Sequence, residues 1–505
     1  MRIIRIILAL FLSSFVLSQE TKGSFGSVVI DGETYNQASV RPEFKVSNLA
    51  VALDIYFYFN SKGIKMDTWD FSDGKSAYRT LIDKIYYLKW GEPSDNFYFM
   101  FGSLPSVTMG QGILVGGYSN AIDYPSERRS GLDLKVRGYG VGLEAIYSDF
   151  KKNSPGLAGA RLSYSPINKI EFGVSYAKDM NQFSGLADAD EDGYPDVYDK
   201  YPDDEQKYSE FEENKSFWYE NYTSLCGIEG CPDMPFENWF EGVKGNEFSL
   251  SDQDEDPVSG FGFDVIYKAT DWLSAYGQYA SLRGEYLDPL NPVDREGIEQ
   301  KSNLGYGFSF PGIHADLGFF SLRAEYRQSS RGFTFGYWDR SYETNRVQVA
   351  VEEGGDNSII TKESQLYNFG ELKGFFVQFN SSLLNAINFD MSYQDMSGEK
   401  WENSNSDDLG VYVEDSNKSF TAVLSILPSF IPKVNKLEAF YQQKNVPNPF
   451  DFVQDLSTIS GVSASVEMTG GMVLVYTQTT SYIKNLDSGS LEPVTSVNIE
   501  TQMSF

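Results

Sequence analysis

The chain has 505 residues and a formal net charge of −30 at neutral pH, with 41 Lys and Arg against 71 Asp and Glu. This balance argues against a nucleic-acid partner, because phosphate binding requires clustered basic side chains. The charge is concentrated between residues 187 and 256, which hold 22 acidic side chains and 4 Lys. No apolar run of about 20 residues follows residue 18, which excludes membrane-spanning helices from the rest of the chain.

Residues 1–18 have the pattern of a secretory signal peptide. Arg2 and Arg5 precede an apolar run at 6–12, and Val16 and Ser18 occupy the positions before a cleavage site. The apolar run is too short to cross a membrane as a helix. We therefore expect a secreted protein whose mature chain begins at residue 19.

The dominant pattern after the signal is alternation of apolar and polar residues in short runs, which predicts strands with two different faces. Two such runs carry charges on the polar face, namely Asp133, Lys135 and Arg137 in one and Arg323, Glu325 and Arg327 in the other. If the apolar faces point into lipid, these six side chains are candidates for the lining of a lumen.

The connections between the predicted strands alternate in length. Short connections are expected at several places, among them 92–96, 137–140, 269–272 and 311–314, and longer ones lie between them. Outer-membrane barrels show this sorting, with short turns at one rim and long loops at the other. Counted from a first strand at 46–60, the pattern predicts about 18 strands, within a range of 16 to 20.

The final run alternates most clearly and ends on Phe505, which shares a face with Val497, Ile499, Thr501 and Met503. It resembles the C-terminal β-signal of bacterial outer-membrane proteins. The resemblance implies recognition by the barrel-assembly machinery and contact with outer-membrane lipid in a Gram-negative bacterium. The expected fold class is all-β, a transmembrane antiparallel barrel over residues 19–505. Both termini would be periplasmic, and the long loops, with an acidic insertion at 183–257, extracellular.

The insertion contains a regular acidic motif, Asp188-Ala-Asp190-Glu-Asp192-Gly193-Tyr194-Pro-Asp196-Val-Tyr-Asp199. Alternating carboxylates around a turn-forming Gly suit Ca²⁺, which takes six to eight oxygen ligands. The motif resembles a thrombospondin type 3 repeat, and the resemblance implies Ca²⁺ binding by the side chains of Asp188, Asp190, Asp192, Asp196 and Asp199. The backbone carbonyl of Tyr194 would complete the shell. A solvated acidic loop is the alternative.

Cys226 and Cys231 are the two cysteines of the chain and lie in the same insertion. A close pair in a secreted protein predicts a local disulfide. A two-Cys metal site is the alternative, although His314, the single His, is far away in sequence. His314 falls in the predicted turn at 311–314, so the chain has no clear catalytic triad.

The Gly-rich segment 102–120 lacks the Lys-Ser or Lys-Thr ending of a phosphate loop. It follows a strand that runs toward the long-loop rim. One interpretation is a constriction loop that folds inward, with Arg128 and Arg129 behind it. The other is an ordinary surface loop.

These features predict a non-enzymatic, porin-like channel for passive passage of small solutes, with a calcium-stabilised extracellular loop. The acidic insertion would concentrate cations at the mouth and favour cationic or neutral solutes. An alternative is a barrel that anchors a calcium-dependent adhesion or partner-binding surface. A more remote alternative is an outer-membrane hydrolase.

Overall fold

The computed structural model describes most of the chain from residue 20 onward. The described residues are 20–30, 33–122, 124, 127–152, 155–186, 188, 194–196, 198–202, 204, 207–208, 214–228, 235–244, 257–290, 300–351, 357–383, 386–403, 410–426, 431, 433–468, 472–484 and 490–504. The predicted signal peptide and Phe505 lie outside them.

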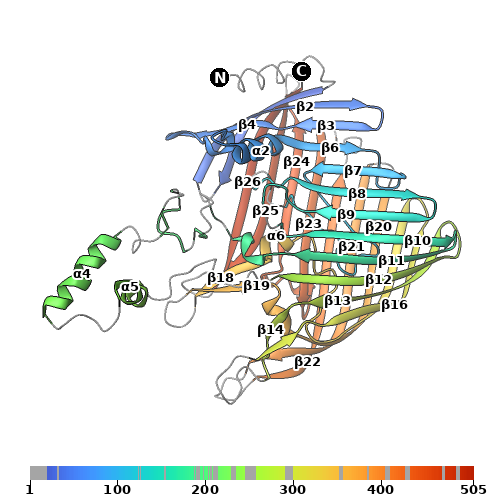
Figure 1. The fold of residues 1–505 in the computed structure, drawn as a ribbon. Coiled ribbons are helices and arrows are strands. Elements are labelled where there is room, and N and C mark those ends of the chain that lie inside the picture. The colour runs from blue at the N-terminus through green and yellow to red at the C-terminus, as the bar shows by residue number, and fades with distance from the viewer. Residues whose placement is uncertain are drawn as a thin grey trace.

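An antiparallel β-sheet that closes on itself dominates the described residues (Figure 1). The first strand, β1, pairs with β2 on one side and with the last strand, β26, on the other, so that Lys22 lies opposite Ser504. Strands β3 and β4 are consecutive parts of one barrel strand, because both pair with β2. The short strand β5 pairs with β4. Counting β3 and β4 as one strand, the described residues form a closed barrel of 20 strands. Each barrel strand pairs with a neighbour on both sides, so the barrel has no open edge.

The strands of this sheet are β1 (Glu20–Ile30), β2 (Glu33–Val46), β3 (Leu49–Leu53), β4 (Ile55–Asn60), β5 (Gly63–Ile64), β6 (Ile85–Trp90), β7 (Phe97–Gly102), β8 (Gly131–Gly138), β9 (Val141–Tyr147), β10 (Ala158–Ile167), β11 (Ile170–Asp179), β12 (Val258–Lys268), β13 (Leu273–Arg283), β16 (Tyr306–Asp316), β17 (Phe320–Ser329), β20 (Phe369–Leu383), β21 (Ile387–Glu402), β22 (Val411–Ile426), β23 (Val434–Val446), β24 (Ile459–Glu467), β25 (Met472–Lys484) and β26 (Leu491–Ser504).

The barrel of the described residues has one hairpin more than the predicted 18 strands, which places it at the upper limit of the predicted range of 16 to 20. The barrel strand formed by β3 and β4 corresponds to the predicted first strand, but the hairpin of β1 and β2 precedes it. Polar and small residues such as Gly23, Ser24, Gly26 and Ser27 occupy much of β1, so the alternation there is weak. The hairpin keeps the number even, and both ends of the described chain lie at the same rim.

The predicted turn at 311–314 is also wrong. Strand β16 continues through these residues, and the chain reverses between Asp316 and Phe320. The register against both neighbouring strands shifts beside Pro311, between Ser309 and Gly312 on the β17 side. Proline lacks an amide donor and is tolerated at such a bulge, so here it interrupts the ladder without ending the strand.

The long connections lie at the rim from which α4 and α5 project in Figure 1. They contain the following elements: η1 (Asp67–Trp69), α2 (Gly74–Asp83), η2 (Gln182–Gly185), α4 (Lys215–Ile228), α5 (Phe236–Lys244), β14 (Glu285–Leu287), β15 (Lys301–Asn303), α6 (Tyr342–Asn345), β18 (Val347–Val351), β19 (Asn357–Thr361), η3 (Ser364–Asn368) and η4 (Pro449–Asp451). The opposite rim has short turns, such as Tyr139 and Gly140 between β8 and β9.

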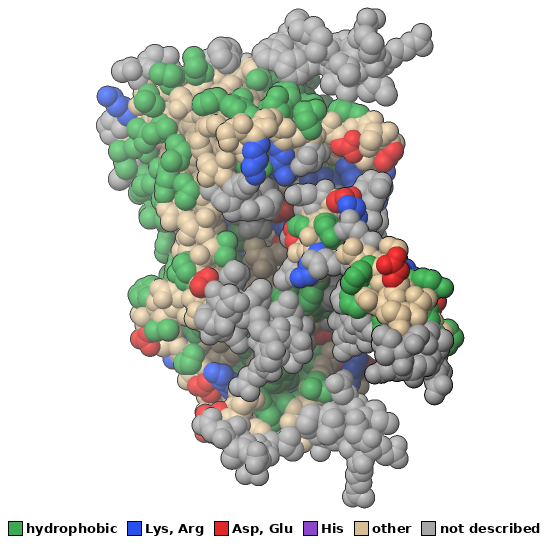
Figure 2. Space-filling model, turned by 90° about the vertical axis from the view of Figure 1, so that its left-hand side faces the viewer, with side chains coloured by type: hydrophobic (Ala, Val, Ile, Leu, Met, Phe, Trp, Pro, Cys, Tyr) green, Lys and Arg blue, Asp and Glu red, His purple; other side chains and the backbone are tan. Residues whose placement is uncertain are grey.

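The outer face of the barrel is apolar. Along β12, for example, Phe261, Phe263 and Tyr267 are exposed, whereas Asp264 on the opposite face is buried. Figure 2 looks onto the long-loop rim and shows hydrophobic side chains gathered along the margin of the wall. Exposed apolar residues on one face and buried polar residues on the other are the reverse of the pattern in a water-soluble barrel.

Candidate functional site

The Gly-rich segment 103–122 leaves the wall after β7 and folds into the barrel. Gly110 has a φ of +58°, a conformation that glycine adopts without steric cost. A Cβ atom at this position would lie 2.9 Å from Nε of Arg161 on β10, so the backbone closely approaches the inner wall. The inward course, one of the two alternatives that the sequence allowed, is therefore the one observed.

The connection between β17 and β20 also folds inward, and its described residues lie within 330–368. The amide of Trp338 donates a hydrogen bond of 3.1 Å to the carbonyl of Leu114, and the carbonyl of Trp338 accepts one of 3.0 Å from the amide of Gly116. The two segments are thus joined by backbone hydrogen bonds. We call residues 103–122 and the described part of 330–368 the inner layer.

The inner layer supplies most of the hydrophobic core found in the described residues. In this core, side chains of both segments pack against inward-facing residues of the barrel wall. The layer contributes Leu104, Val107, Ile113, Leu114, Tyr118, Phe333, Tyr337, Trp338 and Tyr342, and the wall contributes Ile146, Ala177 and Leu282. Burying each large apolar side chain contributes about 1.5–3 kcal/mol. The inner layer is therefore packed as a core and narrows the lumen.

Charged side chains on the inner wall are paired with one another. Arg161 is 3% exposed and faces three carboxylates on three neighbouring strands. Its guanidinium lies 2.6 Å from Asp264, 2.8 Å from Glu144 and 3.0 Å from Glu171. Such charge-assisted hydrogen bonds compensate for the burial of the guanidinium. This side of the lumen is therefore closed by ion pairs.

A second inner-wall cluster is centred on Glu325 of β17, which is 2% exposed. Its carboxylate accepts hydrogen bonds from Nε of Arg323 at 2.6 Å and from Nε of Arg327 at 2.7 Å. The hydroxyl of Tyr276 also donates to it at 2.6 Å, and Arg327 donates to Gln394 at 2.7 Å. One carboxylate is therefore the counter-ion of two guanidinium groups.

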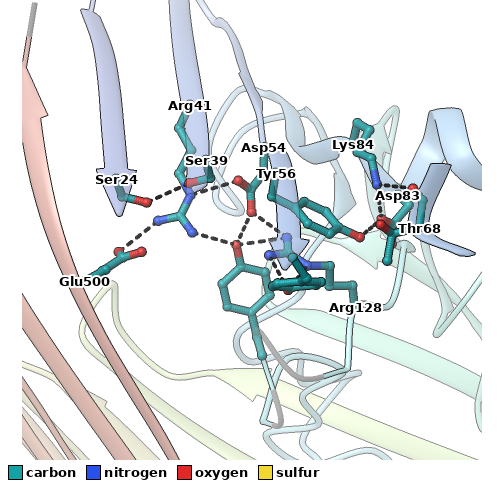
Figure 3. A network of polar contacts seen from close by, with 12 residues as sticks. Ser24, Ser39, Arg41, Asp54, Tyr56, Thr68, Asp83, Lys84, Arg128 and Glu500 are labelled. Atoms are coloured by element: carbon teal, nitrogen blue, oxygen red, sulfur yellow. Dashed lines mark hydrogen bonds and ion pairs between the residues drawn. The ribbon is translucent and has the colours of Figure 1, made fainter. Parts of the chain in front are cut away.

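A third network lies where the last strand meets the first (Figure 3). Arg41 of β2 contacts Glu500 of β26 at 3.0 Å and Asp54, the residue between β3 and β4, at 3.1 Å. Tyr124 and Arg128 each donate to Asp54 at 2.5 Å. This network ties the connection between β7 and β8 to the seam that closes the barrel.

Beside it in Figure 3, Lys84 follows helix α2 and lies 3.0 Å from Asp83. Its ammonium also donates to the carbonyl of Thr68 at 2.8 Å and lies 3.8 Å from the centre of the Tyr56 ring. Burial lowers the pKa of Lys84 to about 8, and Asp83 opposes this change. Burial by itself would raise the pKa of Asp83, but Lys151 and Lys84 hold it well below its ordinary value.

A cavity of about 640 Å³ lies between the inner layer and the wall formed by β17 and β20–β23. Neutral polar side chains line its wall, among them Gln378, Asn380, Ser392, Thr421 and Gln442. Six basic residues line it, namely Arg323, Arg327, Arg340, Lys362, Lys400 and Lys444. The acidic residues of the lining are Asp339, Asp390 and Asp455, so basic side chains outnumber acidic ones in a strongly acidic chain.

The six predicted lumen residues occupy different environments. Arg323, Glu325 and Arg327 form the cluster described above, and the two arginines line the cavity. Asp133 is buried, whereas Lys135 is half-buried and Arg137 is exposed near the short-turn rim. Arg137 there donates to the backbone carbonyls of residues 93 and 95, so it binds the turn between β6 and β7 and does not line the cavity.

The predicted calcium segment is only partly described. Asp190 and Asp192 lie outside the described residues, whereas Asp188, Tyr194, Asp196 and Asp199 lie within them. Among the described residues, no group of three or more His, Cys, Asp or Glu side chains is arranged to hold a metal ion. Asp199 is 7% exposed, and its Oδ1 accepts a hydrogen bond of 2.8 Å from the amide of Tyr201. Its Oδ2 is buried without a hydrogen-bond partner in this part of the structure, which fits a position that binds a cation.

The predicted disulfide lies outside the described side chains, because Cys231 and the side chain of Cys226 are not among them. The helices around the pair, α4 and α5, contact each other through aromatic rings. The ring of Phe236 lies 5.0 Å from that of Tyr219 and 5.5 Å from that of Tyr222. The aromatic residues of the insertion thus pack against one another.

Several lumen residues were missed by the sequence reasoning. The alternation in β10 could have identified Arg161, because the residue stands on the polar face of a regular strand. Asp339 and Arg340 follow no periodic pattern, since they lie in an irregular segment. Their place in the cavity depends on how the connection between β17 and β20 folds inward.

A comparison with protein-family models finds no match, and a comparison with curated protein sequences finds none either. None of the described helices has the length and hydropathy of a membrane span. Among solved structures, Pseudomonas aeruginosa OccK3 (OpdO) is similar with a TM-score of 0.33 and 9% identity, covering 96% of this chain and 94% of that one.

Two further solved structures are similar over nearly the whole chain. Wzi of Escherichia coli, described as a carbohydrate-binding β-barrel of the outer membrane involved in group 1 capsule assembly, has a TM-score of 0.27 and 10% identity, covering 98% of this chain and 86% of that one. The FrpB iron transporter of Neisseria meningitidis has a TM-score of 0.32 and 10% identity, covering 97% and 82%. The function proposed below rests on the geometry of this chain alone.

Proposed function

We propose that the protein is an outer-membrane channel through which small polar solutes pass passively. Support for the membrane location comes from the closed barrel and its apolar outer face. In hydrocarbon every backbone polar group must be paired within the protein, and a closed barrel meets this requirement. The exposed aromatic residues also fall near both rims, with Tyr176, Phe261, Tyr279 and Tyr306 toward the long loops and Trp90, Phe97, Tyr139 and Trp272 toward the short turns. Such girdles are typical of membrane barrels.

The cavity of about 640 Å³ is the observation that carries the channel proposal. Its wall presents Gln, Asn, Ser and Thr side chains, which can replace the hydration of a polar solute. The inner layer narrows the lumen beside it, so that we expect solutes of the size of one or two sugar rings and no passage of proteins. The constriction role of segment 103–122 belongs to this proposal.

Reconstitution in planar lipid bilayers tests the channel. Protein whose unboiled form migrates faster on a gel than its boiled form, and is thus folded as a closed barrel, should give discrete single-channel currents. Absence of conductance from such protein would overturn the proposal. The same gel test addresses the barrel, because a protein that is soluble without detergent and shows no shift is not a membrane barrel.

We further propose that the short-turn rim is periplasmic and the long-loop rim extracellular, and that Phe505 directs assembly by the barrel-assembly machinery. Support comes from the common rim of the two chain ends and from the sorting of the loops. Deleting Phe505 should lower the amount of folded protein in the outer membrane, whereas deleting an exposed residue of the acidic insertion should not. Equal amounts for both variants would contradict the assignment.

The segment 188–199 is proposed to bind Ca²⁺ and to stiffen the acidic insertion. The buried Oδ2 of Asp199 supports this, because a buried carboxylate oxygen requires a partner. Isothermal titration with CaCl₂ should show one site, and Asp199→Asn should weaken it at least about tenfold. Asp204→Asn, which changes an acidic residue outside the motif, is the control. Identical titrations for wild type and Asp199→Asn would exclude this residue as a ligand.

A further inference from the structure

Arg340 differs from the other basic residues that line the cavity. It lies in the inner layer, two residues after Trp338, and its guanidinium is 4.7 Å from the centre of the Phe440 ring. Its Nε is buried without a hydrogen-bond partner among the described residues, and no acidic side chain of this part of the chain forms an ion pair with it. Arg340 is therefore a half-buried cation that lines a polar cavity and has no ion-pair partner among the described residues.

The surroundings of Arg340 leave its charge uncompensated. Burial lowers the pKa of the guanidinium below its ordinary value, and the more distant carboxylates of Glu438 and Asp390 act in the opposite direction. Neither carboxylate forms an ion pair with Arg340, and Glu438 pairs with Lys436 at 3.0 Å. A partly buried guanidinium without a carboxylate partner is stabilised when an anionic acceptor enters the cavity that it lines.

The neighbouring charges add to this excess. Asp339 lies between two ammonium groups, 2.5 Å from Nζ of Lys444 and 3.5 Å from Nζ of Lys362. On β17, Glu325 likewise serves two guanidinium groups. Each of these acidic residues neutralises one positive charge and leaves a second one. The cavity is therefore locally positive although the chain carries a formal charge of −30.

We propose that the cavity is an anion-selective site for a carboxylated solute of about the size of a sugar, and that Arg340 determines this selectivity by binding the carboxylate. A guanidinium presents two parallel donors that match a carboxylate. The neutral polar wall, with Gln378, Asn380 and Ser392, supplies partners for hydroxyl groups on the rest of the solute. This inference rests on the proposed channel and names its substrate class.

The acidic insertion does not oppose this selectivity. Exposed charges are screened within about 8 Å at physiological ionic strength, whereas charges that line a narrow cavity act directly on the ion inside it. The prediction from the sequence that the insertion favours cations and the present proposal differ in the expected sign of the selectivity, which the following experiment measures.

Reversal potentials in a KCl gradient across planar bilayers provide the first test. The wild type should be anion-selective, and Arg340→Gln should lose most of this selectivity. Lys135→Gln is the matched control, because it removes one positive charge from a half-buried position on β8 outside the cavity lining and should leave the selectivity unchanged. Arg340→Lys keeps the charge and should keep the sign of the selectivity.

Block of the chloride current by glucuronate, with glucose as the neutral analogue of equal size, provides the second test. Glucuronate should block the wild type, glucose should not, and Arg340→Gln should raise the half-blocking glucuronate concentration about tenfold or more. Conductance that is cation-selective, or that responds to glucuronate equally in wild type and Arg340→Gln, would overturn the anion site while the channel stands. Absence of conductance from folded protein would overturn both.

Discussion

Replacing Glu325 with Gln removes the single carboxylate that lies between the guanidinium groups of Arg323, which is mostly buried, and Arg327, which is buried. The oxygen–nitrogen distances are 2.6 Å to Arg323 and 2.7 Å to Arg327. At about 3 Å, unit charges attract each other by roughly 5 kcal/mol at an effective dielectric constant of about 20. The amide keeps the shape but not the charge, so both cations lose their counter-ion.

We expect Glu325→Gln to lower the free energy of unfolding by about 3–5 kcal/mol, the range observed when one partner of a buried ion pair is removed. The measurement is a guanidinium titration of protein refolded in phospholipid vesicles, followed by tryptophan fluorescence. The lumen also gains one positive charge, so the variant should be more anion-selective than the wild type.

Glu399→Gln is the matched control for this substitution. Glu399 pairs with Arg331 at 2.9 Å, but the two side chains are 34% and 39% exposed. Exposed pairs contribute about 1 kcal/mol or less because water and salt screen them. If Glu325→Gln lowered the free energy of unfolding no more than Glu399→Gln does, the carboxylate of Glu325 would not be stabilising the two guanidinium groups.

Three other perturbations test the inner layer. Trp338→Ala should destabilise the fold by about 3–5 kcal/mol, because it empties a fully buried position, and should enlarge the single-channel conductance, whereas Trp338→Phe should have a smaller effect on both. Gly110→Val places a β-branched residue at a φ of +58° and a Cβ 2.9 Å from the Arg161 side chain, so the same gain of conductance is expected and an unchanged channel would contradict the close approach. Burial alone would raise the pKa of Asp339, but the two neighbouring lysines, with hydrogen bonds from Lys444 and a serine, lower it from 3.8 to about 2. The carboxylate thus contributes about 2 kcal/mol of stability above pH 4, which is lost as the pH falls from about 4 to 2. Other buried carboxylates titrate in this range in both proteins, so unfolding titrations should show a loss that is about 2 kcal/mol larger in the wild type than in Asp339→Asn.

Alternation in the sequence was sufficient to predict most of the strands and their two faces. A strand has a side-chain period of two, so the apolar residues of β12 and β17 could be assigned to one face and Arg323, Glu325 and Arg327 to the other without knowledge of the fold. The hairpin of β1 and β2 was missed because glycine and serine give little contrast between the faces. The turn predicted beside Pro311 was wrong because a proline at a bulge has the same local pattern as a proline that ends a strand.

The sequence therefore determined the barrel, the sorting of its loops and the common side of its two ends, because these depend on periodicity and on the lengths between strands. Only the tertiary structure decided what fills the barrel. Leu114 and Trp338 are far apart in the chain and meet only when both connections fold inward. Arg340 faces the cavity for the same reason. Residues in irregular segments have no period that assigns them a face, and their surroundings come from distant strands that closure of the barrel brings together.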